Sequence, residues 1–206
     1  MVAVIDYGVG NLFSLISSLK AIGADAVITN DVEKIKSADR IILPGVGAFE
    51  DAAKKLFDSG LHKVLIEEAE KGKPVMGICL GMQLLFERSF EYGEHKGLGL
   101  IKGDILSFEG KIDKSLKIPQ IGWNALKIIK KECPLWKHIN DGDYVYFVHS
   151  YFAEVSDATS SSSEYGIEFT AAVSSGNIYG CQFHPEKSGT VGLNILRAFC
   201  ECEVAK

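Results

Sequence analysis

The residue best placed to do chemistry is Cys79, which lies in the run PVMGICLGMQ between Gly77 and Gly81. A nucleophile with a glycine two residues away on each side is the pattern of a sharp strand-to-helix turn, here with cysteine in place of serine. The glycines are needed because side chains there would collide with the turn. The turn places the sulfur at a helix N-terminus, which favours the thiolate. The alternative is a buried cysteine in a core strand that merely ends in glycines.

A cysteine nucleophile needs a base, and His184 is the best placed of the five histidines. It follows a strand-like run, and Glu186 comes two residues later, across a proline. A carboxylate in that position could hold one imidazole tautomer and stabilise the imidazolium, as in a Ser-His-Asp triad. The other interpretation is a histidine in an ordinary turn, since His184 is far from Cys79 in the sequence. His149 also follows a strand-like run. The other three histidines are expected at the surface: His62, His95 and His138.

The elements that must position these residues follow from hydrophobic periodicity. In the first half, short apolar runs predict strands at Val2–Ile5, Ala26–Thr29 and Arg40–Leu43, and in the run before Cys79. Helical patterns lie between them, at 11–23 with Asn11 as the N-cap, and at 33–37, 51–57, 61–71 and 83–87. This order predicts an α/β fold with a mostly parallel open sheet flanked by helices. Sites in such sheets form at the carboxyl ends of strands, where turns 6–11, 44–47 and the Cys79 turn would meet.

The second half has a different pattern. From residue 98 to 183 the apolar runs are short and separated by turn residues, which predicts additional antiparallel strands. A short helix is expected at 134–139 and a closing helix at 192–202. The serine run at 160–163 is expected to form a mobile surface loop. We expect one domain to span residues 1–206.

Bulk composition excludes several classes of protein. Hydrophobic residues make up 47% and charged residues 24%, as in ordinary globular domains, and a net charge of −5 indicates no surface for nucleic acid. No apolar run approaches the roughly 20 residues of a membrane span, and no signal peptide is apparent. The five cysteines are odd in number and form no CxxC pair, so neither a disulfide framework nor a metal site is expected. No cofactor is expected, and the cytoplasm is the expected compartment.

Taken together, the motifs resemble those of class I, triad-type glutamine amidotransferases. The two segments that carry the resemblance are GICLGMQ at 77–83 and QFHPEKSG at 182–189. Five further segments fall in the order found in the family of glutaminase subunits of imidazole glycerol phosphate synthase, an enzyme of histidine biosynthesis. They are DYGVGNL at 6–12, PGVGAF at 44–49, GWN at 122–124, YFVHSY at 146–151 and GN at 176–177. The resemblance spans nearly the whole chain and implies a flavodoxin-like sheet.

For single positions, the resemblance implies a catalytic triad. Cys79 would attack the carboxamide carbon of L-glutamine, which gives a glutamyl thioester and ammonia. His184 would pass a proton to the leaving nitrogen and then activate the hydrolytic water, and Glu186 would orient His184. By the geometry of the turn, the amide of Leu80 would be one donor of the oxyanion hole.

The resemblance also implies the rest of the substrate site. The second oxyanion donor would be the amide of Val46 or Gly47, whose loop contains glycines that allow a peptide flip. Whether this hole is preformed or forms only when a partner binds stays open. The substrate would be held by one side chain and three backbone segments: Gln83, Gly47, Ser150 and Tyr151. The alternatives are that Gln83 is an exposed helix residue and that 150–151 is a simple strand end.

The resemblance further implies a heterodimer with a (βα)8-barrel cyclase subunit, which would use the ammonia to make imidazole glycerol phosphate and aminoimidazole carboxamide ribotide. Asn11, Trp123 and Lys187 are the candidates for the docking face, because an exposed tryptophan is a common interface anchor. The alternative for Trp123 is a core aromatic residue.

One departure from the family pattern bears on the partner. Residues 119–121 read Pro-Gln-Ile, where the family commonly has Pro-His-Met. Three other functions therefore stay open: the same glutaminase chemistry for a different synthase, such as one for surface-sugar amidation, a catalytically silent regulatory subunit, and a general cysteine peptidase.

Overall fold

The computed structural model describes residues 1–203, and its centre is an eight-stranded sheet with the order β2-β1-β3-β4-β14-β13-β12-β9. Its first five strands are parallel: β2 (Ala26–Thr29), β1 (Val2–Ile5), β3 (Arg40–Leu43), β4 (Val75–Ile78) and β14 (Ile178–Cys181). The last three are antiparallel: β13 (Glu168–Ser175), β12 (Thr159–Glu164) and β9 (Lys127–Ile128). The predicted fold class, a mostly parallel sheet with antiparallel strands added by the second half, is confirmed.

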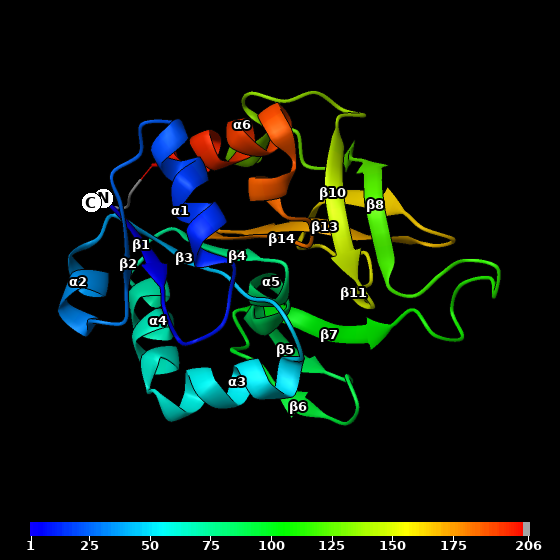
Figure 1. Cartoon of the computed structure of the whole chain (residues 1–206), viewed down its shortest axis with the longest axis horizontal. Coiled ribbons are helices and arrows are strands. Elements are labelled where there is room, and N and C mark those ends of the chain that lie inside the picture. Colours follow the sequence, from blue (N-terminus) through cyan, green and yellow to red (C-terminus); the bar gives the residue numbers. More distant parts are fainter. Residues whose placement is uncertain (204–206) are drawn as a thin grey trace.

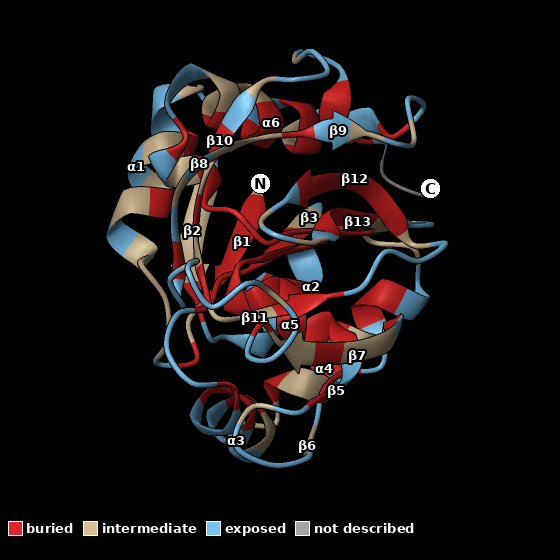
Figure 2. Ribbon diagram, turned by 90° about the vertical axis from the view of Figure 1, so that its right-hand side faces the viewer, coloured by how far each residue is buried: buried red, intermediate tan, exposed pale blue. Residues whose placement is uncertain are grey.

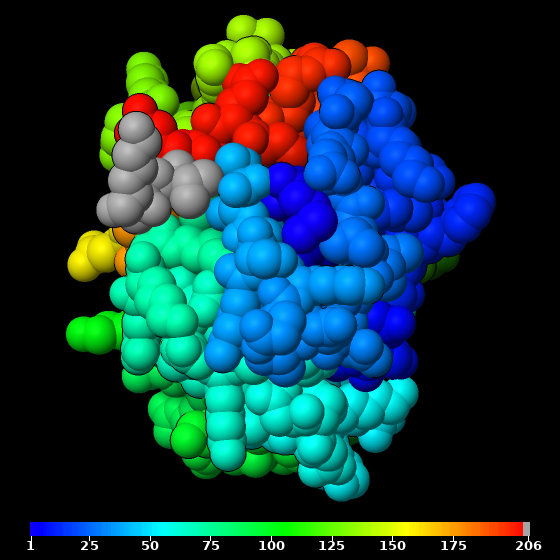
Figure 3. All heavy atoms as spheres, turned by 90° about the vertical axis from the view of Figure 1, so that its left-hand side faces the viewer, coloured from blue at the N-terminus to red at the C-terminus, as the bar shows by residue number. Residues whose placement is uncertain are grey.

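Helices cover both faces of this sheet (Figure 1). On one side lie α1 (Leu12–Ala21) and α6 (Gly189–Cys200), and on the other lie α3 (Phe49–Asp58), α4 (Leu61–Glu70) and α5 (Leu80–Leu85). The blue α2 (Val32–Ser37) packs beside α4 on the face that Figure 3 shows. Covering both faces explains why β1 reads VAVI without a polar residue.

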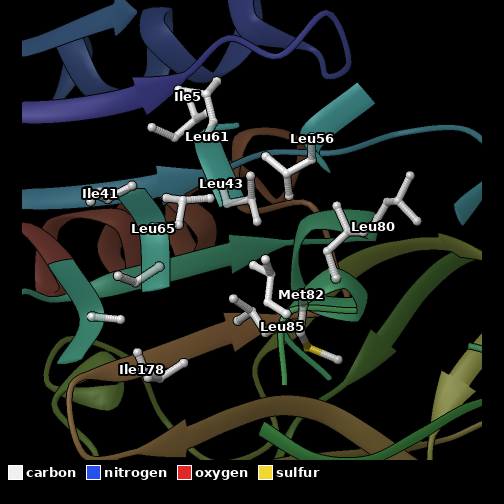
Figure 4. Packing of buried hydrophobic residues seen from close by; sticks show 14 of the residues in the cluster. Ile5, Ile41, Leu43, Leu56, Leu61, Leu65, Leu80, Met82, Leu85 and Ile178 are labelled. Atoms are coloured by element: carbon white, nitrogen blue, oxygen red, sulfur yellow. The ribbon is translucent and has the colours of Figure 1, made fainter. Parts of the chain in front are cut away.

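The two helical layers make two hydrophobic cores on opposite faces of the sheet. Successive strand side chains point to opposite faces, so Ala3 and Ile5 of β1 pack in one core, while Val2 and Val4 pack in the other. Figure 4 shows the first core, in which strand residues meet side chains of three helices. The labelled members are Ile5, Ile41, Leu43, Leu56, Leu61, Leu65, Leu80, Met82, Leu85 and Ile178.

Two smaller sheets flank the end of the parallel strands. One has the order β11-β7-β5-β6 and contains β5 (Phe86–Ser89), β6 (His95–Lys96), β7 (Ile101–Ser107) and β11 (Tyr151–Ala153). The other is an antiparallel ribbon of β8 (Gln120–Ala125) and β10 (Tyr144–His149), which stands across the sheet in Figure 1. Two short 3-10 helices complete the fold, η1 (Pro134–Trp136) and η2 (Pro185–Lys187).

The serine run at 160–163 is not a surface loop, and that prediction was wrong. These residues form most of β12, which pairs with β13 on one side and β9 on the other. All four serines are at most 4% exposed, and Figure 2 shows β12 as buried. Two of the four hydroxyls are hydrogen-bonded: Ser162 donates to Glu168 and Ser163 donates to the carbonyl of Ala125. The hydroxyls of Ser160 and Ser161 are buried without a partner among the described residues.

Several predicted boundaries and positions also need correction. The helix after Cys79 ends at Leu85, and Glu87 lies in strand β5 instead. The expected helix at 134–139 is only the 3-10 turn η1, and the closing helix begins at Gly189. Asn11 is at the N-cap position of α1, but its side chain makes no capping hydrogen bond. His138 is exposed, whereas His62 and His95 are half-buried.

In the described part of the chain, no helix combines the length and apolar character that a membrane span requires.

Candidate active site

Cys79 lies in the abrupt connection between β4 and α5. Its backbone has φ 54° and ψ −113°, in the positive-φ region that non-glycine residues rarely adopt. Such a conformation costs on the order of 1–3 kcal/mol and persists only where surrounding contacts enforce it. Here the amide of Cys79 donates to the carbonyl of Cys181 at 2.8 Å, and its carbonyl accepts from the amide of Gln83. The sharp strand-to-helix turn predicted from the glycine spacing is confirmed.

The flanking glycines are required because three backbone segments meet at this turn. A Cβ on Gly81 would overlap the carbonyl oxygen of Leu43, and one on Gly77 would lie 2.5 Å from the carbonyl oxygen of Gly81. A Cβ on Gly45 would lie 2.7 Å from the amide nitrogen of Gly81. The loop after β3 therefore sits directly against the Cys79 turn, and this contact brings Val46 and Gly47 close to the nucleophile.

The sulfur opens into a cavity of about 410 Å³, within the size range of small-molecule sites. Nine of the residues singled out from the sequence line it: Val46, Gly47, Cys79, Leu80, Gln83, Ser150, Tyr151, His184 and Lys187. Four further lining residues were not assigned to the site beforehand: Glu91, Pro119, Val148 and His149.

His184 and Glu186 form a buried pair beside the sulfur. The Nδ1 of His184 lies 2.8 Å from Oε1 of Glu186, and the two side chains are 2% and 3% exposed. Burial lowers the pKa of His184, but interaction with Cys79 and Glu186 outweighs it and raises that pKa to about 9. Because Nδ1 serves the carboxylate, Nε2 is the nitrogen left for the sulfur. At neutral pH the imidazole is therefore charged, and it holds a proton that it can give to a leaving group.

The turn that carries His184 and Glu186 is hydrogen-bonded to the β8–β10 ribbon. The amide of His184 donates to the carbonyl of Tyr146 at 2.9 Å, and the amide of Tyr146 donates to Oγ of Ser188 at 3.0 Å. Pro185 begins the 3-10 helix η2, whose tight turn brings Glu186 back onto the imidazole. The sequence His-Pro-Glu thus places base and carboxylate on one short, fixed segment.

Two buried glutamines lie behind the nucleophile. Gln83 is 5% exposed, which excludes the alternative of an exposed helix residue. Its Nε2 donates to the carbonyl of Tyr151 and to Oε1 of Gln182, both at 3.0 Å. In turn, Nε2 of Gln182 lies 3.7 Å from Sγ of Cys79. Gln182 belongs to a segment that the sequence analysis quoted, but no role was assigned to it.

The first glycine turn does not line the cavity, although it was expected to join the site there. It supports the neighbouring loop instead. The hydroxyl of Tyr7 donates to the carbonyl of Pro44 at 2.7 Å, and a Cβ on Gly10 would lie 3.2 Å from the Pro44 ring. Gly47, with φ 94°, needs the backbone freedom of glycine. The first turn thus supports the site through the 44–47 loop.

Glu91 and His149 are the polar lining residues that sequence reasoning missed. Burial raises the pKa of Glu91, whose Oε2 accepts from the amide of Phe49 at the start of α3. Burial also lowers the pKa of His149 to about 4, so its ring is neutral and Nδ1 donates to the carbonyl of Tyr151 at 2.8 Å. Glu91 lies in a loop with no local pattern to mark it, whereas the strand before His149 was a usable signal.

The candidates for the docking face lie in different environments. Trp123 is 51% exposed and packs edge-on against Tyr146, so the alternative of a core aromatic residue was wrong. Lys187 is exposed, with Nζ 5.9 Å from the centre of the Tyr146 ring. Asn11 is half-buried at the start of α1. Two positions depart from the family pattern: Gln120 is 1% exposed and pairs across the ribbon with His149, whereas Ile121 is 62% exposed on the same strand as Trp123.

Comparison with known proteins agrees with the fold and shows the family to which the chain belongs. The family model described as "Glutamine amidotransferase class-I" matches residues 3–201, and this chain belongs to that family. A solved glutamine amidotransferase superposes with a TM-score of 0.75 at 18% identity and covers 98% of both chains. The PurLQS structure from Thermotoga maritima superposes with a TM-score of 0.71 at 22% identity and covers 96% of both chains. At these identities the superpositions support the fold alone.

Within the family, much more similar relatives exist. The "Imidazole glycerol phosphate synthase subunit HisH" of Caldanaerobacter subterraneus subsp. tengcongensis is 50% identical over 203 residues, which cover 98% of each protein. The protein of the same name from Wolinella succinogenes is 47% identical and covers 98% of this chain and 99% of its own. The resemblance inferred from the sequence motifs is therefore confirmed, and so is the glutamine amidotransferase class of enzyme.

Proposed function

We propose that this chain hydrolyses L-glutamine at Cys79 and delivers the ammonia to a cyclase that makes imidazole glycerol phosphate in histidine biosynthesis. The observation that carries the proposal is the constellation at the end of the parallel sheet, where a cysteine on a strained turn faces a buried histidine–glutamate pair. Relatives named as subunits of imidazole glycerol phosphate synthase, about half identical over nearly the full length, support the particular pathway.

The reaction follows from the positions of the groups. The Cys79 thiolate adds to the carboxamide carbon of glutamine, and the charge that develops on oxygen is stabilised by the amide of Leu80 and an amide of the Val46–Gly47 peptide region. The His184 imidazolium gives its proton to the leaving nitrogen, so ammonia departs and a glutamyl thioester remains. His184 then takes a proton from water, whose oxygen displaces the sulfur and releases glutamate.

The walls of the cavity supply groups for the two ends of the amino acid. Glu91 places a carboxylate in the lining, where the substrate ammonium group can meet it. The carbonyl of Tyr151 already accepts from Gln83 and His149, so its two lone pairs are used. We therefore assign substrate contact to the backbone N–H of Tyr151 and to the backbone of Ser150 and Gly47.

The partner we propose is a (βα)8-barrel cyclase subunit that covers the cavity mouth. Free ammonia in neutral water is mostly ammonium, a poor nucleophile, so the product has to pass directly to the synthase. Lys187 lines the cavity and contacts Tyr146, against which the exposed Trp123 packs, so the cavity mouth and the docking candidates are continuous. We also propose a cytoplasmic location, supported by five free cysteines.

The test is the release of glutamate from glutamine, measured with and without the cyclase subunit from the same organism and its nucleotide ligand. We expect strong release only with partner and ligand present, and none from Cys79→Ala under any condition. If a sugar-nucleotide synthase stimulates the release instead, the proposed glutaminase reaction stands, but the assignment to histidine biosynthesis is wrong. If no partner stimulates any release, the remaining hypothesis is a catalytically silent regulatory subunit. The intact triad geometry argues against that hypothesis.

A further inference from the structure

Gln182 is a buried amide next to the nucleophile. It follows β14 directly, its amide continues the strand pairing by donating to the carbonyl of Ala171 at 2.8 Å, and it is 0% exposed. Its side chain contacts two site residues: Oε1 accepts from Gln83 and Nε2 faces Sγ of Cys79. Burying a primary amide is costly unless it is hydrogen-bonded, and both ends of the Gln182 amide have a partner.

The carbonyl of Tyr151 fixes the donor and acceptor of each of these hydrogen bonds. The carbonyl of Tyr151 can only accept, so Gln83 must turn its NH₂ group towards it. The same NH₂ group has a second hydrogen, which requires the oxygen end of Gln182 to face it. Gln182 therefore has to present its own NH₂ group to Sγ. The carbonyl of Tyr151 thus sets the orientation of both amides. Each hydrogen bond fixes which end of the next side chain must donate and which must accept.

The same chain of bonds orients Gln83 towards the substrate. Both hydrogens of its Nε2 are used, one by Tyr151 and one by Gln182. Its Oε1 is therefore the end left for the cavity, where an acceptor suits an ammonium group. Without Gln182 the amide of Gln83 would lose one of the two contacts that hold it in this orientation.

We propose that Gln182 is a further residue of the glutaminase machinery: its N–H donates to the Cys79 sulfur, and its carbonyl fixes Gln83 as an acceptor for the substrate's ammonium group. This inference rests on the proposed function and extends it. The sulfur is negatively charged before attack on the carboxamide and again when water displaces it from the thioester. A hydrogen bond to the charged form stabilises that form, so the donor acts at both ends of the cycle.

The test separates the two roles with two variants of the full-length protein. Gln182→Met removes donor and acceptor, whereas Gln182→Glu keeps an acceptor for Gln83 and replaces the NH₂ group. The first readout is the pH profile of alkylation of Cys79 by iodoacetamide, followed on its own peptide by mass spectrometry. This readout needs neither the partner nor glutaminase activity. The second is KM for glutamine in the complex with the cyclase. Gln120→Met is the matched control, because it also removes a buried amide, but one that binds Asn124.

We expect Gln182→Met to raise the alkylation midpoint by about one pH unit and KM by about tenfold. Gln182→Glu should raise the midpoint and change KM less, and Gln120→Met should change neither. A Gln182 variant that folds and keeps the wild-type midpoint would overturn the donor role, and an unchanged KM in Gln182→Met would overturn the orienting role. If Gln182→Met does not fold, Gln182→Leu, which also lacks a donor and adds no charge beside the sulfur, decides the donor role. A wild-type protein without glutaminase activity would instead refute the proposed function, whatever the alkylation midpoints are.

Discussion

At the scale of single residues, the site depends on how one carboxylate holds one imidazole. His184 would be neutral if burial alone acted on it, because burial lowers the pKa of a histidine. Its contacts with Cys79 and Glu186 reverse that effect, so the proton is in place for the leaving ammonia. The strained backbone of Cys79 serves the same end, since it aims the sulfur at the imidazole and the cavity rather than into the sheet.

The raised pKa of His184 predicts how stability changes with pH. The folded protein binds this proton up to about pH 9, whereas the unfolded chain releases it near pH 6.5. The stabilisation is therefore fully present below about pH 6.5 and is lost as the pH rises through 9. Glu186→Gln removes one of the causes, so its free energy of unfolding should fall less between pH 6 and pH 9 than that of wild type. Urea titrations at both pH values measure this, and equal losses would contradict the assignment.

At the scale of elements, the Cys79 turn and the loop after β3 are one packed unit. Gly81 is the residue on which that packing depends, because its Cα hydrogen faces the carbonyl of Leu43 with no space for a methyl group. The unit explains why two glycine-rich segments far apart in the sequence act at one site. It also means that Cys79 and the 44–47 loop, the proposed second side of the oxyanion hole, cannot move independently.

Gly81→Ala should therefore destabilise the protein by several kcal/mol, on the order of the largest single-residue effects, or prevent folding. Gly142→Ala is the control, since Gly142 has φ 88° but open space around a Cβ. That change should cost only about 1–2 kcal/mol, from the left-handed backbone alone. Free energies of unfolding in urea compare the two. Equal, small losses would show that the turn can relax away from Leu43.

The burial of β12 gives a second prediction at this scale. Ser161 is 0% exposed between two neighbouring strands, so Ser161→Lys would bury an unpaired charge and should cost about 3 kcal/mol or more. Ser17→Lys on the exposed side of α1 should change stability by less than about 0.5 kcal/mol. Melting temperatures of the two variants are compared with wild type. If both are tolerated equally, segment 160–163 behaves as the surface loop that its composition suggests.

The elements also show what sequence alone could predict. The Cys79 turn was predictable because its geometry requires the flanking glycines. Strand β1 was predictable because burial on both faces leaves no polar positions. The serine run was misleading because composition cannot show that strands pair with this segment on both sides. Glu91 could not be found, because only the tertiary structure brings its loop to the start of α3.

At the scale of the whole molecule, the β8–β10 ribbon connects the cavity to the proposed docking face. His149 of β10 lines the cavity, and Tyr146 of the same strand contacts both Trp123 of β8 and Lys187. The ribbon also holds the His184 turn through two hydrogen bonds of the Tyr146 backbone, one with the amide of His184 and one with Oγ of Ser188. A partner that rests on Trp123 therefore contacts the element that positions the base.

Trp123→Ala should weaken binding of the cyclase subunit by about 30-fold or more, as for a central aromatic anchor. The stability of the isolated chain should change little, because the indole is half exposed. Phe90→Ala is the control, an aromatic residue of comparable exposure that follows β5 of the four-stranded sheet. Titration calorimetry with the cyclase gives both affinities. Unchanged binding by Trp123→Ala, or an equal loss with Phe90→Ala, would place the interface elsewhere.

The proposed mechanism requires that glutamine is cleaved through a thioester on Cys79. The most direct measurement is the mass of the protein after rapid acid quenching during turnover of glutamine with the cyclase and its ligand. We expect a fraction of chains to be heavier by one glutamyl group, located on the peptide that contains Cys79 and absent from Cys79→Ala. Cys133→Ala, which removes another buried thiol, should keep the adduct. Glutamate release at full rate from Cys79→Ala, or an adduct on another cysteine, would contradict the account.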